Sequence, residues 1–72
     1  MRVLRKFVSS SAVRSVGYDD ALHILEVEYI SGDVYRYYGV PRRAYERLSK
    51  APSKGTYVNR EIKPKFPYAK AA

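Results

Sequence analysis

Residues 34–41, VYRYYGVP, decide the fold of this chain. Valine and tyrosine favour strands, whereas proline cannot continue the hydrogen-bond ladder of a sheet. The run of three tyrosines and one arginine is therefore extended, and it ends at the Gly-Val-Pro corner. We predict a central strand that carries either the core or a binding surface.

The preceding run, residues 22–30, alternates apolar and polar side chains and predicts a second strand. Its apolar face holds Leu25, Val27 and Tyr29, and its acidic face holds Glu26 and Glu28. Residues 31–33 then form a turn. A three-residue loop places Gly32 in a left-handed conformation. The resulting opposed pairs are Val27 with Tyr35 and Leu25 with Tyr37.

In this register Tyr35 and Tyr37 point inward, while Arg36 and Tyr38 lie on the outer face beside Glu26 and Glu28. A two-residue loop would shift the register by one residue and exchange the two faces. We prefer the first register, because burying Arg36 without a partner costs more than burying a tyrosine ring whose hydroxyl reaches the edge.

The remaining elements follow from local signals. Residues 12–18 predict a first strand, ended by a turn at Asp19 and Asp20. Residues 42–51 predict a short helix that starts at Pro41 and cannot pass Pro52. Residues 53–55 are a loop or a helix cap, and residues 56–62 are a short helix or a turn.

Residues 63–72 contain two prolines and predict an extended tail that holds Phe66 or Tyr68 against the body. The fold class is therefore α+β: a small antiparallel meander of three strands, or four, followed by a short helix packed on one face.

Composition excludes several classes of protein. The chain has 72 residues, no cysteine and one histidine, so neither a disulfide nor a thiolate metal site stabilises it, and we expect no metal and no cofactor. It has no apolar run near the roughly 20 residues that span a membrane. We expect a bacterial cytoplasmic protein with no membrane partner and no small-molecule substrate.

Catalytic residues are not expected either. The one histidine, His23, falls within the predicted strand, and no serine is framed by glycines, so a nucleophile would lack its base. Asp19 and Asp20 are interpreted as turn formers rather than as a catalytic carboxylate pair. We therefore predict a protein that is not an enzyme.

Charge is strong and uneven. The formal net charge is +7, with basic residues near both ends and acidic residues concentrated in residues 17–40. Such a field favours encounter with an acidic partner, either a nucleic acid or an acidic protein surface.

Two sets of residues are candidate binding sites. The N-terminal arm interleaves apolar and basic residues, which suits an added edge strand, a segment that docks on a partner, or a frayed terminus. Its candidate protein-contact residues are Arg2, Val3, Leu4, Arg5, Lys6 and Phe7. The alternative is an RNA surface, since aromatic rings stack on bases and cations neutralise phosphates. Its candidate residues are Arg36, Tyr38, Arg42, Arg43, Lys54, Tyr35 and Tyr37.

Several of these motifs occur together in the order found in one known family. They are Ser10-Ser11, Val13, Val16-Gly17-Tyr18-Asp19, Leu25-Glu26-Val27-Glu28-Tyr29, Gly32, Val34-Tyr35-Arg36-Tyr37, Val40-Pro41, Tyr45, Ala51-Pro52-Ser53-Lys54-Gly55, Tyr57, Asn59 and Ile62. On these residues the chain resembles the KTSC domain, which occurs at the C-terminus of some lysyl-tRNA synthetases and as small free-standing bacterial and phage proteins.

The resemblance implies a single domain over residues 10–68, preceded by a basic-apolar arm at residues 1–9 and followed by a tail at residues 69–72. It implies RNA binding as a candidate role and brings no catalytic residues. A free-standing chain this short and basic is also similar to a small bacteriophage transcription regulator. That regulator binds the host RNA polymerase, blocks initiation by interfering with the sigma factor, and promotes read-through of terminators.

Three hypotheses follow. The first is a transcription regulator that binds bacterial RNA polymerase by protein contact through the arm. The second is an RNA-binding module, and the third is a general protein-interaction domain.

Overall fold

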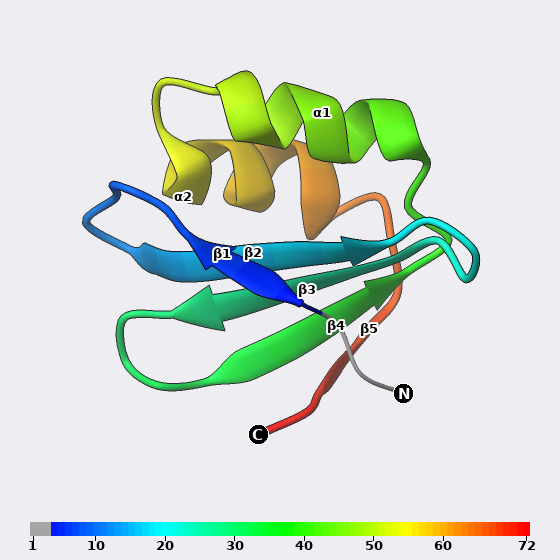
Figure 1. The fold of residues 1–72 in the computed structure, drawn as a ribbon, viewed down its shortest axis with the longest axis horizontal. Coiled ribbons are helices and arrows are strands. Elements are labelled where there is room, and N and C mark those ends of the chain that lie inside the picture. The colour runs from blue at the N-terminus through cyan, green and yellow to red at the C-terminus, as the bar shows by residue number, and fades with distance from the viewer. Residues whose placement is uncertain (1–3) are drawn as a thin grey trace.

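Five antiparallel strands form one sheet in the order β1-β2-β3-β4-β5, and helices α1 and α2 lie on one face of it (Figure 1). The computed structural model describes residues 4–72, so the predicted contact residues Arg2 and Val3 lie outside the described residues. The elements are β1 Arg5–Phe7, β2 Val13–Asp19, β3 Ile24–Tyr29, β4 Val34–Tyr38, α1 Arg42–Lys50, α2 Lys54–Tyr57, the π-helical turn η1 Val58–Ile62, and β5 Tyr68–Lys70.

The α+β class and the antiparallel meander are confirmed, but the sheet has five strands rather than three or four. The two extra strands are short edges. β1 pairs with β2, and β5, which lies in the predicted tail, pairs with β4. β1 confirms the alternative of an added edge strand for the arm. β5 has only three residues, which is too short to show the alternation from which a strand is recognised in sequence.

The preferred register of the central hairpin is confirmed. Val27 lies opposite Tyr35 and Leu25 opposite Tyr37. The loop places Gly32 at φ +100, a conformation that a residue with a Cβ rarely adopts. Arg36 lies beside Glu26 as expected. Tyr38 does not lie beside a glutamate, because its partner is Ile24.

The predicted strand over residues 22–30 begins two residues late. β3 starts at Ile24, and His23 has a positive φ of 55 in the turn before it. The Asp19 carboxylate accepts a hydrogen bond from the backbone N–H of Leu22 at 2.9 Å, which holds this turn closed. His23 therefore lies outside the strand in which the sequence placed it.

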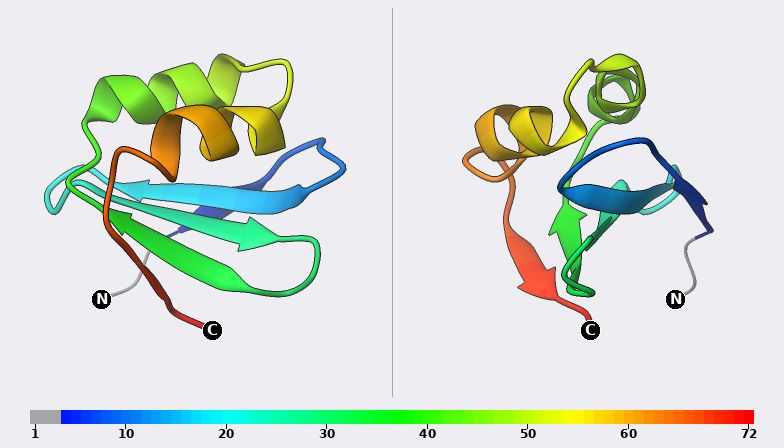
Figure 2. Two further views of the ribbon diagram at one scale, coloured as in Figure 1. Left: turned by 180° about the vertical axis from the view of Figure 1, so that it is seen from behind. Right: turned by 90° about the vertical axis from the view of Figure 1, so that its left-hand side faces the viewer.

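Both helices cover the same face of the sheet, while no helix in residues 4–72 covers the other face (Figure 2). α1 is the predicted helix, and it ends before Pro52. Residues 56–62, for which both a helix and a turn were open, are helical: they complete α2 and form η1. The core between the helices and the sheet consists of Val13, Val16, Leu25, Val27, Tyr37, Val40, Leu48, Val58 and Ile62.

Candidate functional site

The arm forms the edge of the sheet. β1 pairs with β2 on one side only, so its other edge has no partner strand among the described residues. Leu4 and Phe7 are large apolar residues that are 87% and 80% exposed. Lys6 lies on the opposite face of β1 from Arg5 and Phe7, with its Nζ 6.0 Å from the centre of the Tyr45 ring. This edge presents apolar side chains and an open backbone beside positive charge.

Glu26 links the arm to the central strand. Its carboxylate accepts hydrogen bonds from Nη1 of Arg5 at 2.6 Å and from Nε of Arg36 at 2.8 Å. Glu26 is only 5% exposed although it lies on the face without helices. The hydrogen bond to Glu26 raises the pKa of Arg36. The two guanidinium groups are therefore held in place by one buried carboxylate, while about a third of each arginine side chain faces solvent.

The predicted tyrosines divide between core and surface. Tyr37 is fully buried, and its hydroxyl forms a hydrogen bond of 2.8 Å with that of Tyr29. Burial raises the pKa of both hydroxyls. Tyr35 is half-buried and stacks on Tyr68 with ring centres 5.6 Å apart. Tyr38 is 39% exposed on the outer face. Tyr37 therefore cannot stack on a base without opening the core.

Sequence reasoning did not name Tyr68 among the candidate binding residues. This ring is 54% exposed and contacts Tyr35 and Tyr37, so it is the outermost member of an aromatic cluster. An aromatic residue after Pro67 in a basic segment was the available signal. It was interpreted only as an anchor for the tail.

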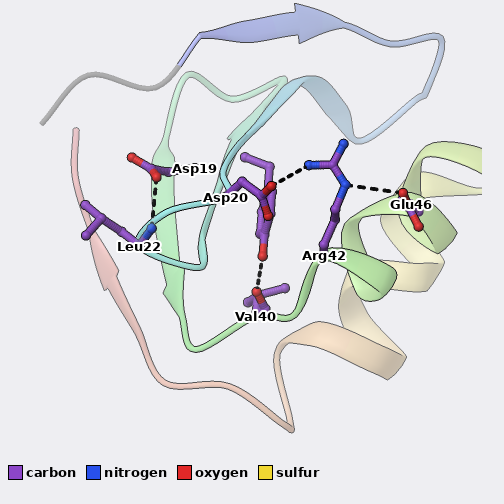
Figure 3. Close-up of polar contacts among 7 residues, drawn as sticks. Asp19, Asp20, Leu22, Val40, Arg42 and Glu46 are labelled. Carbon is purple, nitrogen blue, oxygen red and sulfur yellow. Dashed lines mark hydrogen bonds and ion pairs between the residues drawn. The ribbon is translucent and has the colours of Figure 1, made fainter.

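Arg42 is held by two acidic side chains, Asp20 from the turn between β2 and β3 and Glu46 from α1 itself (Figure 3). Its Nη1 lies 2.9 Å from Asp20 Oδ2, and its Nε lies 3.4 Å from Glu46. Asp19 closes the same turn through the backbone of Leu22. Asp19 and Asp20 thus lie in the turn, as expected for turn formers, and Asp20 and Glu46 occupy Arg42.

Lys54 is also occupied. Its Nζ donates to the backbone carbonyls of Ser49 at 3.1 Å and Ala51 at 2.6 Å, at the C-terminal end of α1. Positive charge at that end stabilises a helix. A polar hollow of about 390 Å³ lies nearby, lined by Ser9, Ser10, Ser11, Pro52, Ser53 and Lys54.

The two candidate sets are thus arranged differently. The described arm residues lie together on one edge. The RNA candidates are divided: Arg36 and Tyr38 lie on the sheet face without helices, whereas Arg42, Arg43 and Lys54 lie in the helical layer. Residues 4–72 contain no group of three metal-ligating side chains and no helix long and apolar enough to cross a membrane.

Comparison with known proteins identifies the family. The KTSC domain model matches residues 9–66. A protein of Stutzerimonas stutzeri described only as uncharacterized is 45% identical over 60 residues, covering 83% of this chain and 84% of that protein. The lysine–tRNA ligase of Trichormus variabilis is 41% identical over 58 residues, which are 81% of this chain but 10% of the ligase.

The fold of this chain also matches that of a solved structure from the same family. The crystal structure of a KTSC domain protein from Yersinia pestis superimposes with a TM-score of 0.93 at 38% identity, covering 99% of this chain and 100% of that one. The motifs from Ser10 to Ile62, the five-stranded sheet and these similarities lead to one conclusion: the chain belongs to the KTSC domain family.

Proposed function

We propose that this chain is a non-enzymatic transcription regulator that acts in the bacterial cytoplasm by protein contact, with RNA polymerase as its partner. The observation that carries the proposal is the exposure of Leu4 and Phe7, 87% and 80%, on an open edge strand. Inhibition of initiation through the sigma factor, and antitermination, are the effects implied by the similarity to a phage regulator.

The edge of β1 suits a protein partner for two reasons. An open strand edge can pair with an extended segment of another chain, and exposed apolar side chains beside it add contact area. Arg5 and Lys6 place positive charge at the same edge. An acidic protein surface would therefore be attracted to this edge and then anchored by Leu4 and Phe7.

The test is retention of the chain by purified bacterial RNA polymerase at moderate salt. A Leu4→Ser/Phe7→Ser variant removes the apolar contacts and is expected to lose retention. The matched control is Leu22→Ser/Ile30→Ser, which removes two exposed apolar residues, 58% and 47% exposed, from the turns on either side of β3. Equal retention of both variants, or no retention of the unaltered chain, would contradict the proposal.

RNA binding is the second candidate function, and relatives named lysine–tRNA ligase favour it because they contain a segment similar to this chain. On the face of the sheet without helices, Arg36 and Tyr38 are the residues able to contact RNA, whereas the exposed Tyr68 lies on the opposite face beside Tyr37. An Arg36→Gln/Tyr38→Ser variant should then bind a labelled RNA more weakly while the polymerase contact is unchanged. If neither polymerase nor RNA is bound, the general protein-interaction domain is the remaining hypothesis.

A further inference from the structure

Most of the net positive charge of this protein lies in its helical layer. Residues 42–65 contain eight lysines and arginines against Glu46 and Glu61, whereas residues 1–41 contain five basic and five acidic residues. The helices lie together on one face of the sheet (Figure 2). An anionic ligand is therefore attracted mainly to the helical side of the molecule.

A groove lies on this side, between the end of α1 and the segment formed by α2 and η1. Its volume is about 460 Å³, within the range of about 300–1,000 Å³ typical of sites for small ligands. It is lined by Arg47, Ala51, Pro52, Ser53, Thr56, Tyr57, Arg60 and Glu61. Leu48, Val58 and Ile62 point from the same helices into the core and hold the two sides of the groove in place.

The two arginines that line this groove have no acidic partner within the described part of the chain. Arg47 and Arg60 are exposed, and within residues 4–72 neither guanidinium forms a hydrogen bond or an ion pair. Arg5, Arg36 and Arg42, by contrast, each hold an acidic partner. Two unpaired guanidiniums beside one groove can together contact the oxygens of a phosphate.

The one acidic residue in the groove is already engaged. Glu61 accepts a hydrogen bond from Lys65 at 2.7 Å, and this bond is the main cause that lowers the pKa of the carboxyl. The positive charges of Arg47 and Arg60, which line the same groove, lower the pKa of Glu61 further. The net charge of the lining remains positive.

The floor of the groove suits a planar ring. Tyr57 is half-buried against the core and is therefore fixed, and Pro52 and Ala51 add apolar surface beside it. The Thr56 hydroxyl accepts a hydrogen bond from that of Ser53 at 2.9 Å. The proton of the Thr56 hydroxyl is not donated to any residue in 4–72, so this hydroxyl can donate it to a polar atom of the ligand's planar ring.

The groove also continues along the helices. An adjoining hollow of about 160 Å³ shares Arg47, Tyr57 and Glu61 with it. This hollow adds the cations Arg43 and Lys65 and the aromatic Phe66. Cations beside aromatic rings in two neighbouring hollows suit the phosphates and bases of a single strand.

We propose that the groove between α1 and α2–η1 binds a nucleotide of single-stranded nucleic acid, with its phosphate between Arg47 and Arg60 and its base against Tyr57 and Pro52. An acidic peptide would satisfy the arginines but leave the aromatic floor without a planar partner. The inference goes beyond the protein contact at β1. It shares with the second candidate function, RNA binding, only the class of ligand, because that function uses Arg36 and Tyr38 on the sheet and not the residues of the groove.

The test compares two variants that lose the same charge. Arg47→Gln/Arg60→Gln removes the phosphate contacts in the groove, and the control Arg14→Gln/Lys50→Gln removes two exposed cations outside it. Affinity for a fluorescent oligouridine is measured by anisotropy over a range of salt concentrations. Uridine monophosphate is titrated separately while the backbone amides of Thr56 and Tyr57 are followed by NMR.

The groove variant is expected to bind the oligouridine about tenfold more weakly than the control. The slope of its log affinity against log salt should fall by about 0.7, because both arginines contact the same single phosphate of the strand. Tyr57→Leu, which keeps the apolar packing, should weaken binding without changing the salt slope. Shifts of the two amides with the monophosphate identify a site for free nucleotides as well. Binding of the oligouridine without such shifts identifies a site for RNA strands.

Three results would overturn the inference: equal affinity of the groove and control variants, absence of oligouridine binding, or tighter binding of an acidic peptide than of the oligouridine. The outcome also separates the two RNA hypotheses. If the groove variant binds normally while Arg36→Gln/Tyr38→Ser does not, the sheet is the RNA surface and the groove is not.

Discussion

Glu26 is a buried carboxylate that joins two strands through two arginines. Arg5 from β1 and Arg36 from β4 both donate to it, at 2.6 and 2.8 Å. Hydrogen bonds to charged groups are stronger than neutral ones, and removing one partner leaves the others poorly satisfied. One residue thus ties the N-terminal arm to the middle of the sheet.

Replacing this carboxylate should destabilise the protein. We expect Glu26→Gln to lower the free energy of unfolding by about 1–3 kcal/mol, because one hydrogen bond loses its acceptor oxygen and the other loses the negative charge of the carboxylate. Urea unfolding measures the change. The control is Glu46→Gln, whose exposed pair with Arg42 is worth less than about 1 kcal/mol. Similar unfolding midpoints for the two variants would show that Glu26 has no special role.

The tyrosine pair makes stability depend on alkaline pH. Burial raises the folded-state pKa of Tyr29 and Tyr37, whereas an unfolded tyrosine ionises near pH 10. The stabilisation from their neutral hydroxyls is therefore complete below about pH 10 and is lost as pH rises above it, towards the folded pKa values. Urea midpoints measured across this range should fall.

Tyr37→Phe provides the control for this effect. It removes one of the two buried hydroxyls, so its urea midpoint should fall less steeply with pH than that of the unaltered chain. At neutral pH it should lower the free energy of unfolding by about 1 kcal/mol through the lost hydrogen bond. If the urea midpoints of the two proteins change identically with pH, the hydroxyls of Tyr29 and Tyr37 are not the cause of the alkaline loss of stability.

Among the elements, α2 sits against the loop before β2. A Cβ added to Gly55 in α2 would lie 2.9 Å from the Cβ of Ala12, closer than two such atoms normally approach. Glycine is required here by this contact and not by its backbone angles, since alanine is the better helix former by about 1 kcal/mol.

Gly55→Ala should therefore lower stability in spite of its higher helix propensity. The expected loss is about 1–3 kcal/mol, the usual range for overpacking. In the background of Ala12→Gly the same substitution should be neutral or stabilising, because the opposing methyl is gone. Thermal unfolding of the two single variants and the double variant measures this coupling. Additive effects would mean that the two residues do not meet.

The whole molecule depends on β5, which closes the sheet next to β4. Removing residues 67–72 would take the Tyr68 ring from the aromatic cluster and leave the backbone of β4 without its partner. We expect a loss of about 2–3 kcal/mol, which lowers Tm by roughly 10–20 °C, together with self-association through the open edge of β4.

Circular dichroism and light scattering measure the two effects. Tyr68→Ala in the full chain removes the ring but keeps the backbone pairing, so it should lower Tm without causing self-association. If the shortened chain melts like the full chain and stays monomeric, β5 is dispensable.

At the same scale, charge and shape are divided between the two layers. The helical layer carries most of the net charge, and the sheet provides the exposed edge of β1. The two proposed contacts, a protein at β1 and a nucleotide between the helices, thus use different parts of one small domain.

Local signals in the sequence determined the central part of this protein. The alternation in β3, the tyrosine run of β4, the left-handed Gly32 and the prolines on either side of α1 fixed the hairpin register and the helix. The same signals separated the inward Tyr37 from the outward Arg36. Each of these depends on residues close together in the chain, which is why sequence alone sufficed.

Tertiary structure decided the remainder. β1 and β5 are strands because β2 and β4 offer them backbone partners. The residues of β1 left an edge strand, a docking segment and a frayed terminus open, and those of β5 indicated only an extended tail. Arg42 and Lys54 proved to be occupied by partners, while Arg47 and Arg60 face one groove from two helices. Such arrangements join residues distant in sequence, and only the folded chain brings their charges and hydrogen-bonding groups within reach of one another.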